Sequence, residues 1–233
     1  PGLAGFETIM HLHSAPLIAH ENSAWGITDG NPIHDSIREI SDKTGVDFSI
    51  DVTINRDHRI TSVYAGELFA VHKAACDVSR RLSMKAVTSP YDIVVTTNSG
   101  YPLDMNVYQS VKGMSAAAQI VQYGGTIICA SECSEGIPDH GEYKELLSSR
   151  DTPKELLEMI NTVGYNHHDQ WQVQIQAQIQ LKAEIQLKSG YLDRGWSILL
   201  QFAAAGSPSP RRKPTLKSRK PDQINCHFAY SRQ

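Results

Sequence analysis

Residues Tyr91–Lys112, with the sequence YDIVVTTNSGYPLDMNVYQSVK, carry the clearest structural signal in this chain. It begins with an apolar, β-branched run, Tyr91–Thr97, which is typical of a strand buried on both faces. A turn rich in Asn, Ser, Gly and Pro follows, and Asp104 can cap a helix whose composition is established from Asn106. The pattern therefore predicts a strand that leads through a turn into a helix.

Two polar side chains stand near the start of this predicted helix. Gln109 and Lys112 are three residues apart, so both project from one side of it. In open α/β sheets, ligands bind where a parallel strand ends and the next helix begins. A solvated helix face has the same pattern, so the sequence leaves a ligand site and an exposed surface equally open here.

A second strand is expected downstream. Two glycines precede the apolar run Thr126–Ala130, so the segment from Tyr91 onward reads as a strand–helix–strand unit. Such units nearly always form a right-handed parallel crossover. The loop Ser131–Asp139 then leaves the second strand at the sheet edge where Gly100 also lies. We expect the two loops to form a crevice that Glu132 helps to line.

Earlier in the chain, Ile33, Ile37 and Ile40 keep helical spacing, which predicts an amphipathic helix that faces the core. Apolar periodicity and turn residues predict the other elements in the same way. Helices are expected at Gly5–His13, Ile33–Lys43, Glu67–Arg80 and from Asp151 to about Thr162, and a β-hairpin from Val46–Ile54 and Ile60–Tyr64.

The segment Asp169–Lys188 gives conflicting signals. Its apolar residues alternate strictly with glutamines, which is the period of a strand. Its length and its content of Gln, Ala, Lys and Glu favour a helix instead. We predict a helix; if the alternation prevails, the segment is an edge strand with a glutamine face.

Composition sets broad limits on function. The chain has 233 residues, 40% of them hydrophobic and 20% charged, which is typical of a soluble globular protein with one or two domains. A formal net charge of −3 argues against nonspecific binding to nucleic acid. No apolar stretch is long enough to span a membrane and no signal-peptide pattern is visible. The four cysteines have no metal-finger spacing, so reduced thiols in a cytoplasmic protein are expected.

Two longer stretches carry a resemblance. The run NSGYPLDMNVYQSVKGM resembles the signature of the C-terminal domain of the nickel-dependent lactate racemase family, with Ser99 where a glycine is usual. The run PGLAGFETIMHLH resembles the family segment Pro-Gly-x-x-Gly-x-Glu-Thr-Ile-x-x-Asn-His. Its final histidine falls on His13, and Leu12 stands where the family has Asn. His34 falls in a further matching stretch, and we interpret it as structural.

The resemblance implies an α/β fold with parts of two α/β domains. Residues 1–85 would form the C-terminal part of the family's N-terminal domain, and residues 86–193 most of its C-terminal domain. Residues 194–233 are rich in proline, serine and basic residues and depart abruptly from the family. This tail is expected to be disordered, as if the reading frame or source sequence changed after Asp193. A basic tail for an acidic partner is the alternative.

The resemblance also implies an activity. Members of the family racemise or epimerise α-hydroxy acids such as lactate, by removing the α-hydrogen as hydride and returning it to either face. Their cofactor is a nickel pincer nucleotide, pyridinium-3,5-bisthiocarboxylic acid mononucleotide nickel, which maturation proteins supply. His13 would ligate the nickel, and Gln109 and Lys112 would hold the substrate. Trp171 would pack beside the pyridinium ring. Considered alone, Trp171 is equally consistent with a core residue, and Lys112 with one more exposed lysine.

Several residues of the family site match no position here. The lysine that tethers the cofactor, two acid–base histidines and a substrate-binding arginine would precede Pro1. We therefore expect a fragment that is inactive by itself. The alternative function is a non-catalytic α/β module in which Gln109 and Lys112 bind an anion without metal. A dinucleotide-dependent dehydrogenase is a weaker fit, because the turn after Thr97 lacks the second and third glycines at the required spacing.

Overall fold

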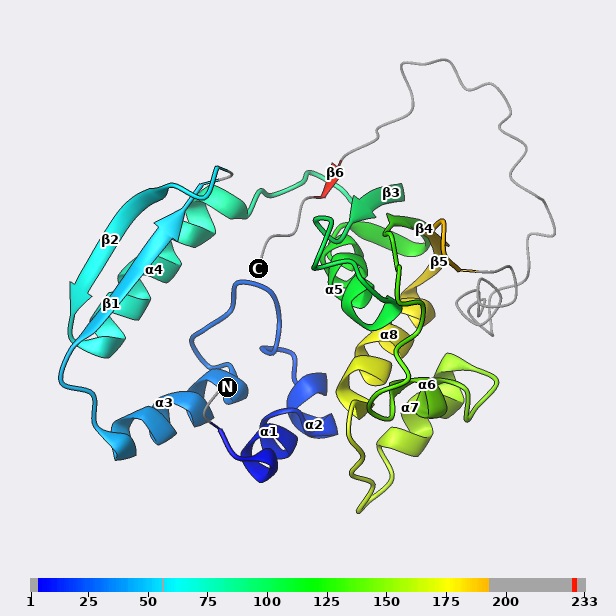
Figure 1. The fold of residues 1–233 in the computed structure, drawn as a ribbon, viewed down its shortest axis with the longest axis horizontal. Helices are drawn as coiled ribbons and strands as arrows, with labels where there is room; N and C mark the ends of the chain where they lie inside the picture. Colours follow the sequence, from blue (N-terminus) through cyan, green and yellow to red (C-terminus); the bar gives the residue numbers. More distant parts are fainter. Residues whose placement is uncertain (1–3, 56, 193–227, 230–233) are drawn as a thin grey trace. The chain divides into compact units, whose positions relative to one another are not determined.

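The computed structural model describes residues 4–55, 57–192 and 228–229 (Figure 1). Contacts divide the chain into two compact units. Unit 1 combines Pro1–Ile18 with Ser89–Gln233, and unit 2 is Ala19–Thr88. The assignment of residues 1–85 and 86–193 to two family domains stays a prediction, and most of the tail, residues 194–233, lies outside the described residues.

Unit 1 is built on a parallel sheet with the strand order β5-β4-β3-β6. Strand β3 (Tyr91–Thr97) is followed by helix α5 (Val107–Ala118) and strand β4 (Val121–Ala130), and β3 and β4 pair in parallel. This confirms the predicted strand–helix–strand unit. Strand β5 (Ala183–Lys188) pairs with β4, and β6 (Phe228–Ala229) pairs with β3, both in parallel.

The segment with conflicting signals contains both kinds of structure. Helix α8 (Gln170–Lys182) begins where the predicted helix begins, and β5 follows it without a loop. The alternative of one long edge strand is therefore wrong for residues 170–182. Most residues of helix α8 are buried, and these include most of its glutamines. The alternation of apolar residues with glutamines therefore does not separate a buried face of this helix from an exposed one. In β5 the buried Ala183, Ile185 and Leu187 do alternate with more exposed residues, as in a strand covered on one face.

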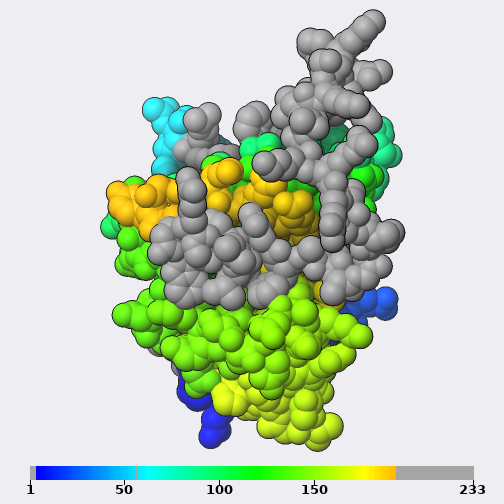
Figure 2. All heavy atoms as spheres, turned by 90° about the vertical axis from the view of Figure 1, so that its right-hand side faces the viewer, coloured from blue at the N-terminus to red at the C-terminus, as the bar shows by residue number. Residues whose placement is uncertain are grey.

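The core of unit 1 lies between this sheet and its helices. Buried Val111 and Met114 of α5 belong to the same apolar cluster as Ile127 of β4 and Ile185 of β5. Helices α1 (Phe6–Leu12), α2 (Ala15–Ala19), α6 (Tyr143–Leu147) and α7 (Pro153–Ile160) complete the described helices of this part of the chain. Figure 2 shows one face of the molecule, where β5, in orange, lies above the yellow-green residues of α6 and α7.

Unit 2 contains helix α3 (Pro32–Thr44), the antiparallel strands β1 (Ser49–Ile54) and β2 (Ile60–Gly66), and helix α4 (Leu68–Ser83). The predicted helix and hairpin are confirmed. The expectation that α3 faces a core is wrong, because Ile37 and Ile40 are 43% and 44% exposed. Helical spacing identifies an apolar stripe, but no described element of unit 2 buries this one.

The described cysteines Cys76, Cys129 and Cys133 are free thiols. Burial raises the pKa of Cys129 to about 12, so this side chain stays a protonated, unreactive thiol at neutral pH. Cys226 lies outside the described residues. Within the described part of the chain, no helix is long and apolar enough to cross a membrane.

Candidate functional site

The start of α5 is fixed by two asparagines. The Asn106 side chain caps the helix by accepting a hydrogen bond from the Gln109 amide at 3.1 Å. The Asn98 side chain donates to the Gln109 carbonyl at 2.9 Å and also to the Leu103 carbonyl. Asp104 is not the cap that the sequence predicted, because its carboxylate accepts from the Glu132 amide at 3.0 Å instead. The turn between β3 and α5 is therefore held from both ends.

Ser99 lies in this turn at the position where the racemase signature has glycine. Its φ is +67°, in the left-handed region that side chains other than glycine rarely adopt. The departure from the family signature therefore places a strained residue beside α5.

We expect Ser99→Gly to raise the free energy of unfolding by about 0.5–1 kcal/mol, because relief of left-handed strain outweighs the extra flexibility of glycine in the unfolded chain. Urea unfolding followed by circular dichroism measures this change. Ser134→Gly is the control, since the exposed Ser134 has no positive φ. A Ser99→Gly variant no more stable than the parent would contradict the strain.

The side chains of Gln109 and Lys112 are partly buried on α5. Burial lowers the pKa of the Lys112 amine, and among the described residues none forms a hydrogen bond or ion pair with it. The Gln109 side-chain amide likewise has no hydrogen-bond partner in the described part of the chain. A half-buried cation with an uncommitted amide three residues away can bind an anion and satisfy both groups.

Trp171 connects α8 to α5. Its side chain is 7% exposed, and its indole Nε1 donates to the Tyr108 hydroxyl at 3.0 Å. One residue further on, Gln172 donates to the Tyr108 carbonyl at 2.6 Å. Burial raises the pKa of Tyr108, so its hydroxyl remains protonated at neutral pH. These contacts hold the Trp171 ring in one orientation against α5.

His13 lies at the C-terminal end of α1 with its ring against Trp171, the two ring centroids being 4.8 Å apart. Its Nδ1 is 2.8 Å from the Ile9 carbonyl oxygen. Because a carbonyl can only accept, Nδ1 is the donor in this contact, and in the neutral imidazole Nε2 then has the free lone pair. Metal-binding histidines in proteins are oriented by such a hydrogen bond on the other ring nitrogen. The contact of His13 with the Ile9 carbonyl is therefore the kind that orients a ligand histidine.

The structure thus brings together residues that are remote in sequence. His13 contacts Trp171, Trp171 contacts Tyr108, and Gln109 follows Tyr108 directly. Lys112 is four residues beyond Tyr108, so it lies one turn further along the same side of α5. Sequence reasoning missed Tyr108, although it begins the Tyr-Gln-x-x-Lys part of the signature.

A separate open cavity of about 570 Å³ lies at the carboxyl ends of β3, β4 and β5. Its lining residues are Thr97, Gly100, Asp104, Ala130, Ser131, Glu132, Lys188, Ser189 and Gly190. This confirms the expected crevice between the loops of Gly100 and Glu132. Gln109 and Lys112 are not among its lining residues.

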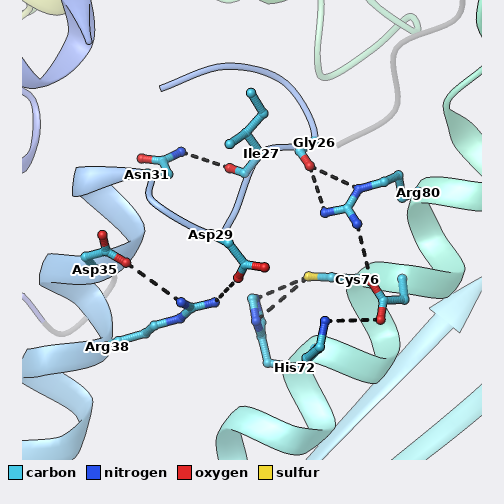
Figure 3. Close-up of polar contacts among 11 residues, drawn as sticks. Gly26, Ile27, Asp29, Asn31, Asp35, Arg38, His72, Cys76 and Arg80 are labelled. Carbon is cyan, nitrogen blue, oxygen red and sulfur yellow. Dashed lines mark hydrogen bonds and ion pairs between the residues drawn. The ribbon is translucent and has the colours of Figure 1, made fainter. Parts of the chain in front are cut away.

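Unit 2 carries a polar cluster of its own (Figure 3). Arg80 of α4 donates twice to the Gly26 carbonyl, at 3.1 and 2.8 Å. Arg38 of α3 forms ion pairs with Asp29 at 3.4 Å and Asp35 at 3.7 Å. Within the described residues, no group of three or more His, Cys, Asp and Glu side chains is placed to hold a metal. This cluster therefore ties a turn to two helices.

The same region contains a pair of histidines whose rings, His34 and His72, are 5.5 Å apart. Burial, the neighbouring His72 and Arg38 together lower the pKa of His34 from its ordinary value of 6.5, and Asp35 opposes them.

Because the unfolded chain then binds a proton more readily than the folded one, we expect stability to fall as the pH drops from about 6.5 through the lowered pKa of His34. Thermal unfolding at pH 7.5 and 5.5 measures the loss, which should be smaller in His34→Gln. An equal loss in both proteins would remove His34 as its source.

Comparison with known proteins agrees with the resemblance. The family model described as "Lactate racemase C-terminal domain" matches residues 86–203. The chain is 36% identical over 180 residues to a lactate racemase of Thermoanaerobacterium thermosaccharolyticum, and 38% identical over 179 residues to one of Lactiplantibacillus plantarum. Each match covers 76% of this chain and 42% of the relative.

The solved structure of the lactate racemase apoprotein from T. thermosaccharolyticum is similar to this one with a TM-score of 0.81 and 30% identity. That similarity covers 87% of this chain and 49% of the solved chain. The chain therefore spans less than half the length of the curated relatives that it matches, and about half of the solved one.

Proposed function

Since this chain belongs to the lactate racemase family, we propose that it supplies one part of the active site of an enzyme that racemises or epimerises α-hydroxy acids such as lactate. The observation that carries this proposal is the contact between His13 and Trp171, with the Nε2 lone pair of His13 uncommitted. Two residues that the family resemblance assigns to one cofactor lie against each other here.

The residues present fit a nickel pincer nucleotide. A neutral imidazole is a good ligand for Ni(II), and the hydrogen bond to the Ile9 carbonyl leaves that form of His13 available. Trp171 would present an aromatic face to the pyridinium ring, which attracts a cation. When bound, the cofactor supplies the acceptor for the α-hydrogen of the substrate. We propose His13 as the metal ligand and Trp171 as the cofactor-binding residue.

Lys112 and Gln109 would bind the substrate. The Lys112 ammonium provides a positive charge that no described residue neutralises, and the carboxylate of a hydroxy acid would pair with it. An anion at this position restores the pKa of Lys112 toward its ordinary value, because the charge pair opposes the effect of burial. Gln109, one turn earlier on α5, would donate its side-chain amide to a substrate oxygen.

The remaining groups of the family site are proposed to come from outside this sequence. No position here matches the tethering lysine, the acid–base histidines or the substrate arginine of the family, and the match covers 42% of each relative. We therefore propose that this chain alone is inactive. Activity would require the rest of the racemase fold and the proteins that mature the cofactor.

A chimera tests this function. The matching part of the T. thermosaccharolyticum racemase is replaced by this chain, matured with the nickel cofactor and assayed for lactate racemisation by chiral chromatography. Lys112→Met is expected to lower kcat/KM about 100-fold, or about 3 kcal/mol of transition-state stabilisation. Lys112→Arg should keep more activity because it retains the charge.

Lys154→Met is the control for this variant, since Lys154 is an exposed lysine of α7 paired with Glu158. Its activity should match that of the parent chimera. With the parent residues in place, KM for lactate should rise as the pH rises through the lowered pKa of Lys112. An inactive, nickel-free chimera that still binds lactate through Lys112 would support the anion-binding module instead.

A further inference from the structure

The β1–β2 hairpin of unit 2 has two unlike faces. One face packs against α4, where Val71 is buried and lies 3.9 Å from the position that a side chain at Gly66 would occupy. Figure 1 shows α4 lying along this side of the two strands. The other face carries five β-branched apolar residues that no described element of unit 2 covers. We call it the hairpin face; it consists of Ile50, Val52, Ile54, Ile60 and Val63.

The register of the strands makes this face continuous. Val52 is paired with Val63, and Ile54 with Ile60 after a register shift between Thr53 and Ile54. This shift brings Ile60 to the same face as Val63, so the side chains form cross-strand neighbours. Each of the five is between 45% and 63% exposed. In a strand, alternate residues point to opposite faces, and here the apolar set points away from α4 while Ser49, Asp51 and Thr53 take the more buried positions.

Such a face is unusual as a permanently solvated surface. Antiparallel sheets normally turn their apolar face to the core and their polar face to water. In this hairpin the more polar face lies toward α4, and the apolar face points away from it. Ile37 and Ile40 of α3 add exposed apolar surface to the same unit. Contiguous apolar surface of this kind typically marks a site that another polypeptide covers.

A second copy of this chain is a poor candidate for the covering partner. The hairpin face consists of only five partly exposed side chains. A stable interface buries about 800 Å² of accessible surface from about 20–30 residues on each partner, so two stacked hairpin faces are too small. A larger partner, which also contacts neighbouring surface of unit 2, is required.

The relatives supply such a partner. Each lactate racemase that matches this chain has 58% of its length outside the match, since the match covers 42% of it. The solved relative likewise has about half of its chain outside the structural similarity. We propose that the hairpin face is the surface on which this chain binds the part of the lactate racemase fold that its relatives carry outside the matched region. This inference rests on family membership and needs no catalytic activity.

Binding between two purified polypeptides tests the proposal. The full chain is mixed with the separately expressed part of the T. thermosaccharolyticum racemase that lies outside the match, and the complex is measured by sedimentation velocity and titration calorimetry. A one-to-one complex is expected. Val52→Lys and Val63→Lys, each made singly, should weaken it at least 10-fold, because either variant places a charge in the centre of the apolar contact.

Val163→Lys is the matched control, because it makes the same change at a valine of unit 1 that is fully exposed. Its affinity should equal that of the parent chain. Val52 and Val63 point to solvent in this chain, so circular dichroism should show that both variants remain folded. A complex insensitive to both variants overturns the proposal. The absence of a complex with a racemase part that circular dichroism shows to be folded also overturns it, whether the chain stays monomeric or associates with itself through the hairpin face.

Discussion

Gly113→Val is expected to lower the free energy of unfolding by about 3 kcal/mol, the upper end of the usual effect of overpacking. A Cβ at Gly113 would lie 2.6 Å from the Thr97 carbonyl oxygen and 3.1 Å from its carbon. Because both atoms are backbone of β3, the helix must move away from the strand to make room. Guanidinium unfolding followed by circular dichroism measures the loss.

The smaller substitution Gly113→Ala tests the same close contact, because helix propensity and packing predict opposite changes in stability for it. In a solvated helix, alanine is more favourable than glycine by about 1 kcal/mol, so propensity alone predicts that Gly113→Ala stabilises. The close approach of α5 to β3 predicts that it destabilises instead. Gly190→Val is the control, because nothing lies within 4 Å of a Cβ at Gly190. A Gly113→Ala variant more stable than the parent would show that α5 does not pack as closely as described.

His13→Ala is expected to reduce the nickel content of the matured racemase chimera to background and its racemisation at least 1,000-fold. The reason is that this substitution removes the imidazole proposed as the protein ligand, while the hydrogen bond from Trp171 to Tyr108 remains. Elemental analysis of the purified protein measures nickel independently of activity.

His11→Ala serves as the matched control for nickel binding. His11 is exposed and two residues from His13, on a different side of α1. Its nickel content should equal that of the parent. Full nickel loading of the His13→Ala chimera would rule out His13 as the ligand, even if activity were lost for another reason.

The parts of the fold that could be predicted from sequence are those with strong local signals. The unit β3–α5–β4 follows from an apolar run, a Gly/Pro turn and a helical segment, all within forty residues. The boundary between α8 and β5 could not be predicted, because the same alternation of apolar residues with Gln or Glu runs through both. The boundary depends on the tertiary contacts that α8 makes on several sides. Local propensity and periodicity in one sequence do not report such contacts.

The candidate site shows the same division. The motifs placed His13, Gln109, Lys112 and Trp171 one by one, but no spacing rule predicts that His13 and Trp171 touch. The role of Tyr108 as acceptor for the Trp171 indole also depends on the way α5 meets α8. For Asp104 the local signal was misleading. Aspartate is a common helix cap, but the carboxylate of Asp104 accepts a hydrogen bond from the Glu132 amide in the loop after β4 instead.

The contact between the N-terminal helices and α8 has a consequence for biosynthesis. The Gln174 side chain donates to the Ala15 carbonyl at 2.9 Å, across 159 positions of sequence. A ribosome adds about 5–20 residues per second, so His13 leaves the exit tunnel about 8–30 s before α8 can receive it. During that interval the imidazole that we propose as the nickel ligand is not yet covered by α8, so any metal ion in solution can reach it. If that proposal is correct, loading with nickel is a task for the completed chain rather than the nascent one.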